Sequence, residues 1–259
     1  TRPGLRLSLK GKVLFGAQVI RTGEEEYLLV CRDTPGSAVI GLLEENIVAD
    51  EVEFTDLSNH WKLSSLFHPS SMNEILAISG IGELSPNEAR QIEKGWAFLN
   101  PSLPGKSLSF LHPADSSPPW LNDLLTADST ELEYLRLHEN LFRPGLEIGD
   151  TEFPQEGGLE EKSVDFDKGC YLGQEVMARI HAMGKVRKQA VAVKGTGKPE
   201  LPCPLLDQGK PVGTLKSQFP LRCGDEWIGT AVIHENALCQ LHKEGLQFEN
   251  SDQRVEILS

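Results

Sequence analysis

The sequence is poor in positive charge and in long apolar runs. Its 25 lysines and arginines stand against 38 aspartates and glutamates and give a net charge of -13. Nothing overall attracts a phosphate backbone, so nucleic acid or an anionic ligand would need a local basic patch. No apolar stretch approaches the roughly 20 residues of a membrane span. The sequence therefore predicts a protein that binds neither nucleic acid nor a membrane directly.

Cysteine is also scarce, and its spacing does not indicate a metal site. The chain has five cysteines, and no two of them form a Cys-x-x-Cys pair. An odd number without close spacing argues against a disulfide framework and against a zinc site. Seven histidines show no His-x-x-x-His spacing either. We therefore expect a reducing, cytoplasmic location and no metal site. The cysteines are Cys31, Cys170, Cys203, Cys223 and Cys239.

Three common functional motifs are missing as well. The sequence has no Gly-x-x-x-x-Gly-Lys-Ser/Thr phosphate loop, no Gly-x-Gly-x-x-Gly following a strand and no Gly-x-Ser-x-Gly nucleophile elbow. The composition that remains is that of an ordinary globular protein, with 39% hydrophobic and 24% charged residues. A chain of 259 residues is long enough for two or three modules.

The start of the chain mixes strand and helix patterns. Residues 5–30 predict three strands in an antiparallel meander with a turn at residues 10–12. Residues 36–47 have helical periodicity, and residues 52–57 alternate again like a strand. These are the ingredients of an α+β module.

A second module is predicted from residue 58 onward. Residues 74–78 and 108–111 favour strands, and a Ser-Pro-Asn-Glu sequence at residues 85–88 indicates the capped start of a helix over residues 89–99. The Ser- and Pro-rich residues 113–119 predict a boundary or a long surface connection.

The remainder of the chain passes from helices to strands. Residues 131–142 and 173–182 have helical periodicity, residues 153–159 form an irregular glycine-containing loop, and residues 164–167 alternate like a strand. Strand candidates separated by Gly and Pro turns then predict a small C-terminal barrel or sandwich. These candidates are residues 189–193, 210–215, 227–233 and 254–258.

The stretch with the most chemistry is Lys-Gly-Cys-Tyr-Leu-Gly-Gln-Glu, residues 168–175, which we call the octapeptide. Cys170 precedes a helix start, where unpaired N–H groups and the helix dipole favour an anion. Lys168 adds a second positive charge. Both effects favour the thiolate and make Cys170 a candidate nucleophile, redox centre or soft-metal ligand. The alternative is a small buried cysteine that fits a tight turn.

Four further residues are candidates for the same site. Gly169 and Gly173 would supply backbone conformations that other residues resist. Glu175 is favoured in the first turn of a helix, and it could also accept hydrogen bonds from a ligand or orient the thiol. Glu156 has little apparent structural duty in its Phe-Pro-Gln-Glu-Gly-Gly loop and could pair with the N–H edge of a pterin or guanine-like heterocycle. An ordinary surface glutamate is the alternative.

The octapeptide resembles the Lys-Gly-Cys-Tyr-x-Gly-Gln-Glu signature of the YgfZ family of folate-binding proteins, which are relatives of the glycine-cleavage T-protein. Phe-Pro-Gln-Glu at residues 153–156, Val-Asp-Phe at residues 164–166 and Gly-Thr at residues 213–214 match the same family's pattern. In the order of its elements, the chain resembles the family over most of its length.

The resemblance implies an α+β fold in three modules arranged as a cloverleaf. A discontinuous central α+β domain would comprise residues 1–57 and 130–184, a second α+β domain residues 58–129, and a C-terminal β-barrel residues 185–259. Tetrahydrofolate, or a methylene or formyl derivative, would occupy a central channel. The contacts that we expect for it are Glu156, Gly169, Tyr171, Gly173, Gln174 and Arg136.

The resemblance also implies a role in iron–sulfur cluster assembly or repair, including in radical enzymes that thiolate tRNA. Partners would be iron–sulfur client or scaffold proteins. The family's essential thiol falls on Cys170, with Lys168 and Glu175 beside it in the predicted catalytic group. One alternative is an aminomethyltransferase of the T-protein type, although the T-protein signature has no cysteine at this position. Another is a folate-binding regulator without catalysis.

The chain departs from the family's pattern in three places, and the first two bear on the folate prediction. The family has a further strand and helix ahead of the turn that here lies at residues 8–12, so part of the folate channel is expected to be absent. His138 stands where the superfamily often has a pterin-binding glutamate. Asn140-Leu141-Phe142 replaces a frequent Gly-Ile-Pro, which indicates local repacking.

Overall fold

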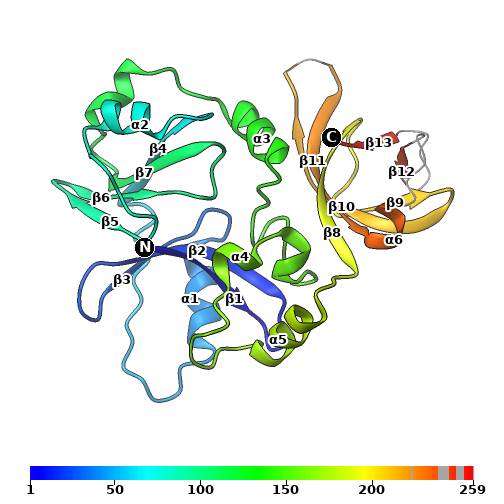
Figure 1. Ribbon diagram of the computed structural model, residues 1–259, viewed down its shortest axis with the longest axis horizontal. Helices are drawn as coiled ribbons and strands as arrows, with labels where there is room; N and C mark the ends of the chain where they lie inside the picture. Colours follow the sequence, from blue (N-terminus) through cyan, green and yellow to red (C-terminus); the bar gives the residue numbers. More distant parts are fainter. Residues whose placement is uncertain (223, 239–244, 249–253, 259) are drawn as a thin grey trace. The chain divides into compact units, whose positions relative to one another are not determined.

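The computed structural model describes residues 1–222, 224–238, 245–248 and 254–258 (Figure 1). The chain forms two compact units: Thr1–Gly4 with Ala17–Thr126, and Leu5–Gly16 with Ala127–Ser259. Within the described residues, no helix is long and apolar enough to cross a membrane.

A three-stranded sheet in the order β1-β2-β3 opens the chain. Its strands are Arg2–Leu7, Val13–Arg21 and Tyr27–Val30. The strands β2 and β3 are antiparallel, so the predicted meander and its turn at residues 10–12 are confirmed. Helix α1, Gly36–Glu44, follows and ends a little before the predicted residue 47.

The first unit also contains a four-stranded antiparallel sheet in the order β4-β7-β6-β5. The strand predicted at residues 108–111 lies within β7. Helix α2 (Met72–Ser79) and the 3-10 helix η1 (Pro119–Asp123) contribute Ile75 and Trp120 to the core of this sheet. The four strands are β4 (Trp61–His68), β5 (Ala89–Ile92), β6 (Gly95–Leu99) and β7 (Lys106–Pro113).

The helix predicted over residues 89–99 is wrong, because this segment forms the β5–β6 hairpin. The capping contacts do form: the Ser85 N–H donates to Glu88 Oε2 (3.1 Å), and the Glu88 N–H donates to the Ser85 carbonyl (3.0 Å). No helix follows, however. Gly95 has a φ of +139°, and a Cβ there would lie 1.9 Å from the carbonyl oxygen of Leu111. Strand pairing with β7 therefore overrides the local helix signal.

Two predicted strands of the first unit are also wrong. Residues 74–78 lie in helix α2, where the Ser71 hydroxyl accepts the Glu74 N–H at 3.2 Å and left-handed Gly80 ends the helix. Residues 52–57 form no strand. Val52 is 51% exposed, and Asp56 instead accepts the Ser58 N–H (2.9 Å) in a local turn. Side-chain bonds of this kind compete with strand pairing.

Short helices precede the barrel in the second unit. Helix α3 (Ser129–His138) starts with a capping box between Asp128 and Glu131, and it stops before the predicted residue 142 because Asn140 has a left-handed φ of 53°. Helix α5 (Gln174–Met183) matches its prediction and ends at left-handed Gly184. Between them lie the 3-10 helix η2 (Pro154–Gly157) and helix α4 (Glu160–Ser163).

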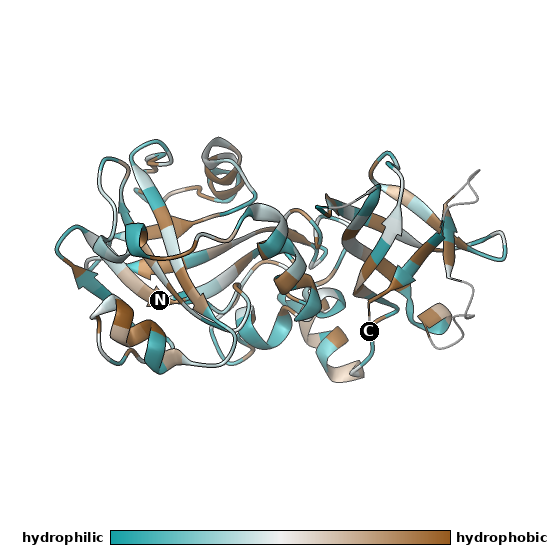
Figure 2. Cartoon of the chain, turned by 90° about the horizontal axis from the view of Figure 1, so that it is seen from above, coloured by the Kyte–Doolittle hydropathy of each residue, from teal (hydrophilic) through white to brown (hydrophobic). Residues whose placement is uncertain are grey.

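The C-terminal strands close into a barrel in the order β10-β11-β8-β13-β12-β9 (Figure 1). The four predicted strands are confirmed, and β9 and β12 are additional. Hydrophobic and hydrophilic residues alternate along the barrel strands (Figure 2). The interior of the barrel is packed with side chains such as Trp227, Leu205 and Leu215. The bounds are β8 Lys188–Thr196, β9 Cys203–Asp207, β10 Lys210–Pro220, β11 Glu226–His234, α6 Glu235–Leu238, β12 Leu246–Phe248 and β13 Arg254–Ile257.

The fold class predicted from the sequence is therefore confirmed: the chain is α+β with a C-terminal β-barrel. The boundaries of the three predicted modules stay a prediction. The second unit matters most for function, because it contains the octapeptide, the barrel and the turn at residues 8–12. One core joins these parts through Leu7, Val13, Met177 and Val232.

Candidate functional site

The octapeptide begins in irregular backbone and ends in the first turn of α5. The strand predicted at residues 164–167 is wrong. The Asp165 carboxylate accepts the N–H of Asp167 at 2.9 Å, and this local turn takes the place of strand pairing. The helix predicted after the octapeptide is confirmed, so Cys170 does precede a helix start, as the sequence indicates.

Cys170 is exposed, together with Lys168, Gly169 and Glu175. The alternative of a small buried cysteine is therefore wrong. Cys31 provides the contrast within the same chain, because burial raises the pKa of its thiol to about 11 and keeps it protonated at neutral pH. Reactivity of a cysteine requires access as well as ionisation. Among the described cysteines, Cys170 has the accessible thiol, since Cys31 and Cys203 are half-buried.

Lys168 and Tyr171 contact each other on either side of the cysteine. The Lys168 ammonium lies 4.8 Å from the centre of the Tyr171 ring, a cation–π contact that orients the lysine over the ring. The Tyr171 hydroxyl is buried and has no hydrogen-bond partner among the described residues. Burial, followed by the charges of Glu160 and Asp165, raises the pKa of this hydroxyl, so it stays a neutral O–H group at neutral pH.

The two glycines of the octapeptide have different roles. Gly173 has a φ of +82°, and a Cβ there would lie 2.7 Å from the Ser8 carbonyl oxygen and 3.1 Å from the Gly11 Cα. Only glycine fits this position, as the sequence predicts. Gly169 lies outside the left-handed region, and a Cβ there would meet nothing within 4 Å. The backbone therefore does not require glycine at residue 169.

Glu156 has a structural duty that the sequence did not reveal. It is 4% exposed, and its Oε2 accepts the Phe153 N–H at 2.8 Å across the η2 turn. Burial raises the pKa of this carboxyl, against the lowering effects of the Phe153 N–H and of Lys12. The interpretation that Glu156 lacks a local partner is thus wrong. Its pairing with a heterocycle stays a prediction.

Arg136 lies inside a buried ion-pair network. It is 1% exposed, and its guanidinium donates to Glu133 Oε2 (2.5 Å), to the Leu141 carbonyl (2.8 Å) and to both Glu147 oxygens (2.9 and 2.7 Å). Each guanidinium nitrogen contacts a protein acceptor. The prediction that Arg136 binds folate conflicts with this arrangement, because a ligand would have to displace a buried carboxylate.

Glu147, the partner of Arg136, was missed in the sequence. It is fully buried and also accepts hydrogen bonds from the hydroxyls of Ser217 (2.6 Å) and Thr230 (2.8 Å), on barrel strands β10 and β11. The network therefore fixes α3 against the barrel. The local pattern around Glu147 does not signal this role, because its barrel partners Ser217 and Thr230 lie 70 and 83 residues away in the chain.

A second group of missed residues surrounds the segment between α4 and α5. Glu160 Oε1 accepts the Gln155 amide N–H (2.8 Å) and contacts His181 Nδ1 (3.2 Å). The His181 ring in turn stacks on Phe166, with centroids 4.1 Å apart. These contacts hold the chain that leads into the octapeptide. His138, by comparison, is exposed, and its ring lies tilted against that of Tyr134 with centroids 4.2 Å apart.

Lysines also gather around residues 151–156, which we call the 151–156 loop. Lys12 donates to the Thr151 carbonyl at 2.8 Å and lies 3.2 Å above the Phe153 ring. Lys216 donates to both Glu152 oxygens at 3.0 Å. Burial opposes ionisation of Glu152, yet its hydrogen bonds from Thr151, the Gly149 N–H and Lys216 outweigh this and hold its pKa below the usual value.

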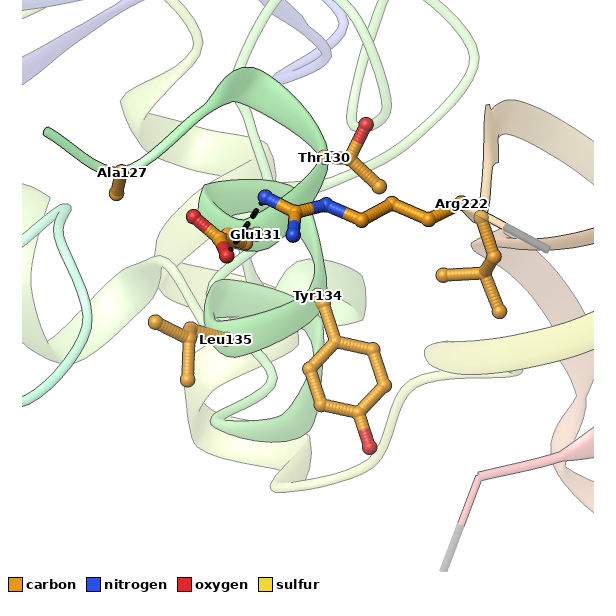
Figure 3. Close-up of a pocket in the computed structure, with 7 residues that line it drawn as sticks. Ala127, Thr130, Glu131, Tyr134, Leu135 and Arg222 are labelled. Carbon is orange, nitrogen blue, oxygen red and sulfur yellow. Dashed lines mark hydrogen bonds and ion pairs between the residues drawn. The ribbon is translucent and has the colours of Figure 1, made fainter.

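A pocket of about 460 Å³ lies beside α3, away from the octapeptide. Arg222 extends across its rim, and its guanidinium contacts Glu131 at 2.8 Å (Figure 3). Tyr134 and Leu135 are among its apolar lining residues, and no octapeptide residue takes part. The described residues hold no group of three or more His, Cys, Asp or Glu side chains suited to a metal ion.

The sequence relatives of this chain include iron–sulfur cluster assembly factors and a protein described as a transferase, although no protein-family model matches the chain. Iron–sulfur cluster assembly factor IBA57 of Mus musculus is 30% identical over 111 residues, which are 39% of this chain and 30% of the mouse protein. The human protein of the same name is 31% identical over 105 residues, or 37% of this chain and 29% of that protein. A chloroplastic protein of Arabidopsis thaliana described as a transferase is 25% identical over 224 residues, covering 81% of this chain and 51% of its own length. The matched stretch thus spans less than a third of either IBA57 protein.

The fold is that of a solved T-protein. The crystal structure of glycine cleavage system aminomethyltransferase T from Bartonella henselae superposes with a TM-score of 0.70 at 16% identity, over 100% of this chain and 75% of that one. The T-protein fold that the octapeptide's resemblance implies is thus confirmed. The names of the mouse and human relatives include "mitochondrial", which does not fit the predicted cytoplasmic location.

Proposed function

We propose that this protein supports the assembly or repair of iron–sulfur clusters and that Cys170 is its functional thiol. The observation that carries the proposal is the exposure of Cys170 within the octapeptide. Gly173 of the same octapeptide packs closely against Ser8 and Gly11. The similarity to IBA57 assembly factors supports the same class of function.

In this function, the residues around Cys170 present the thiol and keep it accessible. The Lys168 ammonium is close to the thiol in sequence and provides positive charge, while the ring of Tyr171 holds the lysine by a cation–π contact. Glu175 is exposed in the first turn of α5 and is available to a partner. The thiol would act on a cluster, or on the protein that donates or receives it, as substrate.

Tetrahydrofolate, or its methylene or formyl derivative, belongs to the proposal only in part. Of the expected contacts, Arg136 and Glu156 are buried against protein groups, and Gly173 packs on Ser8 and Gly11. Tyr171 fits better, because its buried hydroxyl lacks a partner among the described residues. Since Arg136, Glu156 and Gly173 do not fit a folate contact, no step of the proposed function passes through folate. Calorimetry with tetrahydrofolate tests this: heat that disappears in Tyr171→Phe would restore the folate prediction.

An aminomethyltransferase is the second candidate, favoured by the T-protein fold. At 16% identity, the likeness concerns the fold alone, and a fold hosts many activities. The exposed cysteine of this chain has no counterpart in the T-protein signature, so we rank this candidate lower. Release of methylenetetrahydrofolate from an aminomethyl-lipoyl carrier protein would reverse the ranking.

Complementation tests the proposed function directly. In a strain lacking its own relative of this protein, the wild-type chain should restore a cluster-dependent enzyme, such as one that thiolates tRNA, and Cys170→Ser should not. Cys203→Ser provides the matched control, because Cys203 is a half-buried cysteine of strand β9. Full restoration by Cys170→Ser at equal protein level would refute the role of the thiol.

The clients are proposed only as a class. Partners would be iron–sulfur proteins or the scaffolds that carry their clusters, bound by protein contacts, with no direct role for nucleic acid or membrane. The relatives' names favour mitochondria or a compartment of related redox chemistry over the cytoplasm. Restoration of the tRNA-thiolating enzyme, compared with an unrelated cluster enzyme, would test which clients respond.

A further inference from the structure

The turn at residues 8–12, which we call the 8–12 turn, is closed by its own hydrogen bonds. The Ser8 N–H donates to the Lys12 carbonyl (2.9 Å), the Gly11 N–H to the Ser8 carbonyl (2.9 Å), and the Lys12 N–H to the Ser8 hydroxyl (3.1 Å). These three bonds join Ser8 at the start of the turn to Gly11 and Lys12 at its end, so the two ends are held together.

One side of the 8–12 turn supports the octapeptide. Gly173 approaches the turn so closely that a Cβ would lie 2.7 Å from the Ser8 oxygen. Gly11 reciprocates: a Cβ on it would meet Val176 of α5 at 3.3 Å. The backbone at Gly173 therefore lies directly against the backbone of the 8–12 turn, and each side of this contact has a glycine, Gly173 or Gly11. The end of the octapeptide and the start of α5 are fixed by where the turn lies.

The other side of the turn is anchored by one side chain. Lys12 donates to the Thr151 carbonyl at 2.8 Å, lies 3.2 Å above the Phe153 ring and is 3.9 Å from Glu156 Oε2. The next residue contributes a backbone bond, from the Val13 N–H to the Glu152 carbonyl (3.1 Å). The 151–156 loop thus holds the turn by a charged group, an aromatic ring and a carbonyl together.

The electrostatics of this anchor are coupled. Lys12 is 22% exposed and Glu156 5% exposed by side chain. Burial lowers the pKa of Lys12, while Glu156 and Glu152 raise it and Lys188 lowers it. Burial also raises the pKa of Glu156. Both groups are thus more costly to ionise alone than in water, and each is stabilised by the charge of the other.

We propose that Lys12 is a positioning residue for the Cys170 segment: it fastens the 8–12 turn to the 151–156 loop, and the turn in turn fixes the octapeptide through Gly173. Glu156 belongs to the same anchor as the carboxylate partner of Lys12. The inference rests on the proposed function of Cys170, but it concerns the geometry that precedes any reaction.

Alkylation of Cys170 by iodoacetamide, followed on its own peptide by mass spectrometry, tests the inference in the full chain. Lys12→Met should raise the alkylation rate of Cys170 about threefold or more, because the octapeptide opens more readily when the 8–12 turn no longer supports it. Deuterium uptake of residues 168–176 should rise in the same variant. Lys12→Arg should restore both values, since a guanidinium can still donate to the carbonyl and lie over the ring.

Lys216→Met is the matched control. It removes from the same loop the ion pair with Glu152 and the hydrogen bond to the Thr151 hydroxyl, and it leaves the Lys12 contacts in place. Its alkylation rate and its uptake at residues 168–176 should remain as in the wild type. Equal changes in Lys12→Met and Lys216→Met, or no change in Lys12→Met at retained thermal stability, would overturn the inference.

A double-mutant cycle provides a second, independent test of the contact. Gly173→Ala disturbs the same contact from the octapeptide side, so its effect on alkylation should not add to that of Lys12→Met. Additive effects would contradict the proposal. The outcome is separable from the proposed function: if Cys170→Ser proves harmless in cells while the cycle still shows coupling, the positioning role stands and the function falls.

Discussion

Gly173 and Ser8 are in direct backbone contact, although 164 other residues separate them in the chain. A Cβ on Gly173 would lie 2.7 Å from the Ser8 carbonyl oxygen, and Gly173 also has a left-handed φ of +82°. Two independent constraints, one of backbone conformation and one of space, therefore require glycine beside the exposed thiol.

The first prediction concerns the two glycines of the octapeptide. Gly173→Ala should destabilise the protein by about 1–3 kcal/mol through its left-handed backbone alone, with a further cost from the contact with Ser8. Gly169→Ala is the control and should change stability by no more than about 0.5 kcal/mol, since the added methyl meets open space. Urea denaturation measures both. Equal losses in the two variants would contradict the structure.

The second prediction concerns the buried network around Glu147. Arg136→Met should cost about 3–5 kcal/mol, because it leaves Glu147 as a buried carboxylate without its main cation. Lys194→Met provides the control: it breaks the exposed pair between Lys194 and Glu256, 53% and 64% exposed by side chain, and should cost less than about 1 kcal/mol. A small effect of Arg136→Met on the urea midpoint would show that Glu147 has other adequate partners.

The third prediction is a pH dependence from Glu152. Its pKa in the folded protein lies below the ordinary value of 4.5, so its contribution to stability is present above pH 4.5 and is lost as the pH falls through the folded pKa. Glu152→Gln should therefore lower stability at pH 7 by about 1–3 kcal/mol. The loss of stability as the pH falls below about 4.5 should also be smaller in this variant. Thermal unfolding at a series of pH values measures it. The same loss of stability at acid pH in Glu152→Gln as in the wild type would contradict the assigned hydrogen bonds.

The fourth prediction compares two thiols of the folded protein. Cys170 should react with iodoacetamide at pH 7.5 by more than about tenfold faster than Cys31, because burial raises the pKa of Cys31 to about 11 and only a small fraction is thiolate at that pH. Peptide mass spectrometry after timed quenching gives both rates. In urea, where the protein is unfolded, the two alkylation rates should become equal. A difference that persists there would show that neighbouring residues in the sequence, and not burial, cause it.

Local patterns were sufficient where local physics decides. The meander turn, helix α5 with its closing Gly184 and four barrel strands all follow from alternation, periodicity and glycine positions. They failed at residues 89–99. The capping contacts between Ser85 and Glu88 form a single turn ahead of this segment, and strand pairing with β7 then selects a hairpin. They failed again at residues 74–78, which are too short to separate strand from helix by period.

For the candidate site, the sequence by itself determined the octapeptide, its cysteine and the helix that follows. These depend on neighbouring residues and on a motif that a single sequence displays. Only the tertiary structure decided that Cys170 is exposed and that Arg136 pairs with Glu147. It also decided that Glu156 accepts the Phe153 N–H and pairs with Lys12. Burial and charge pairing depend on residues brought together from distant parts of the chain, and no local pattern encodes which partner a buried charge will find.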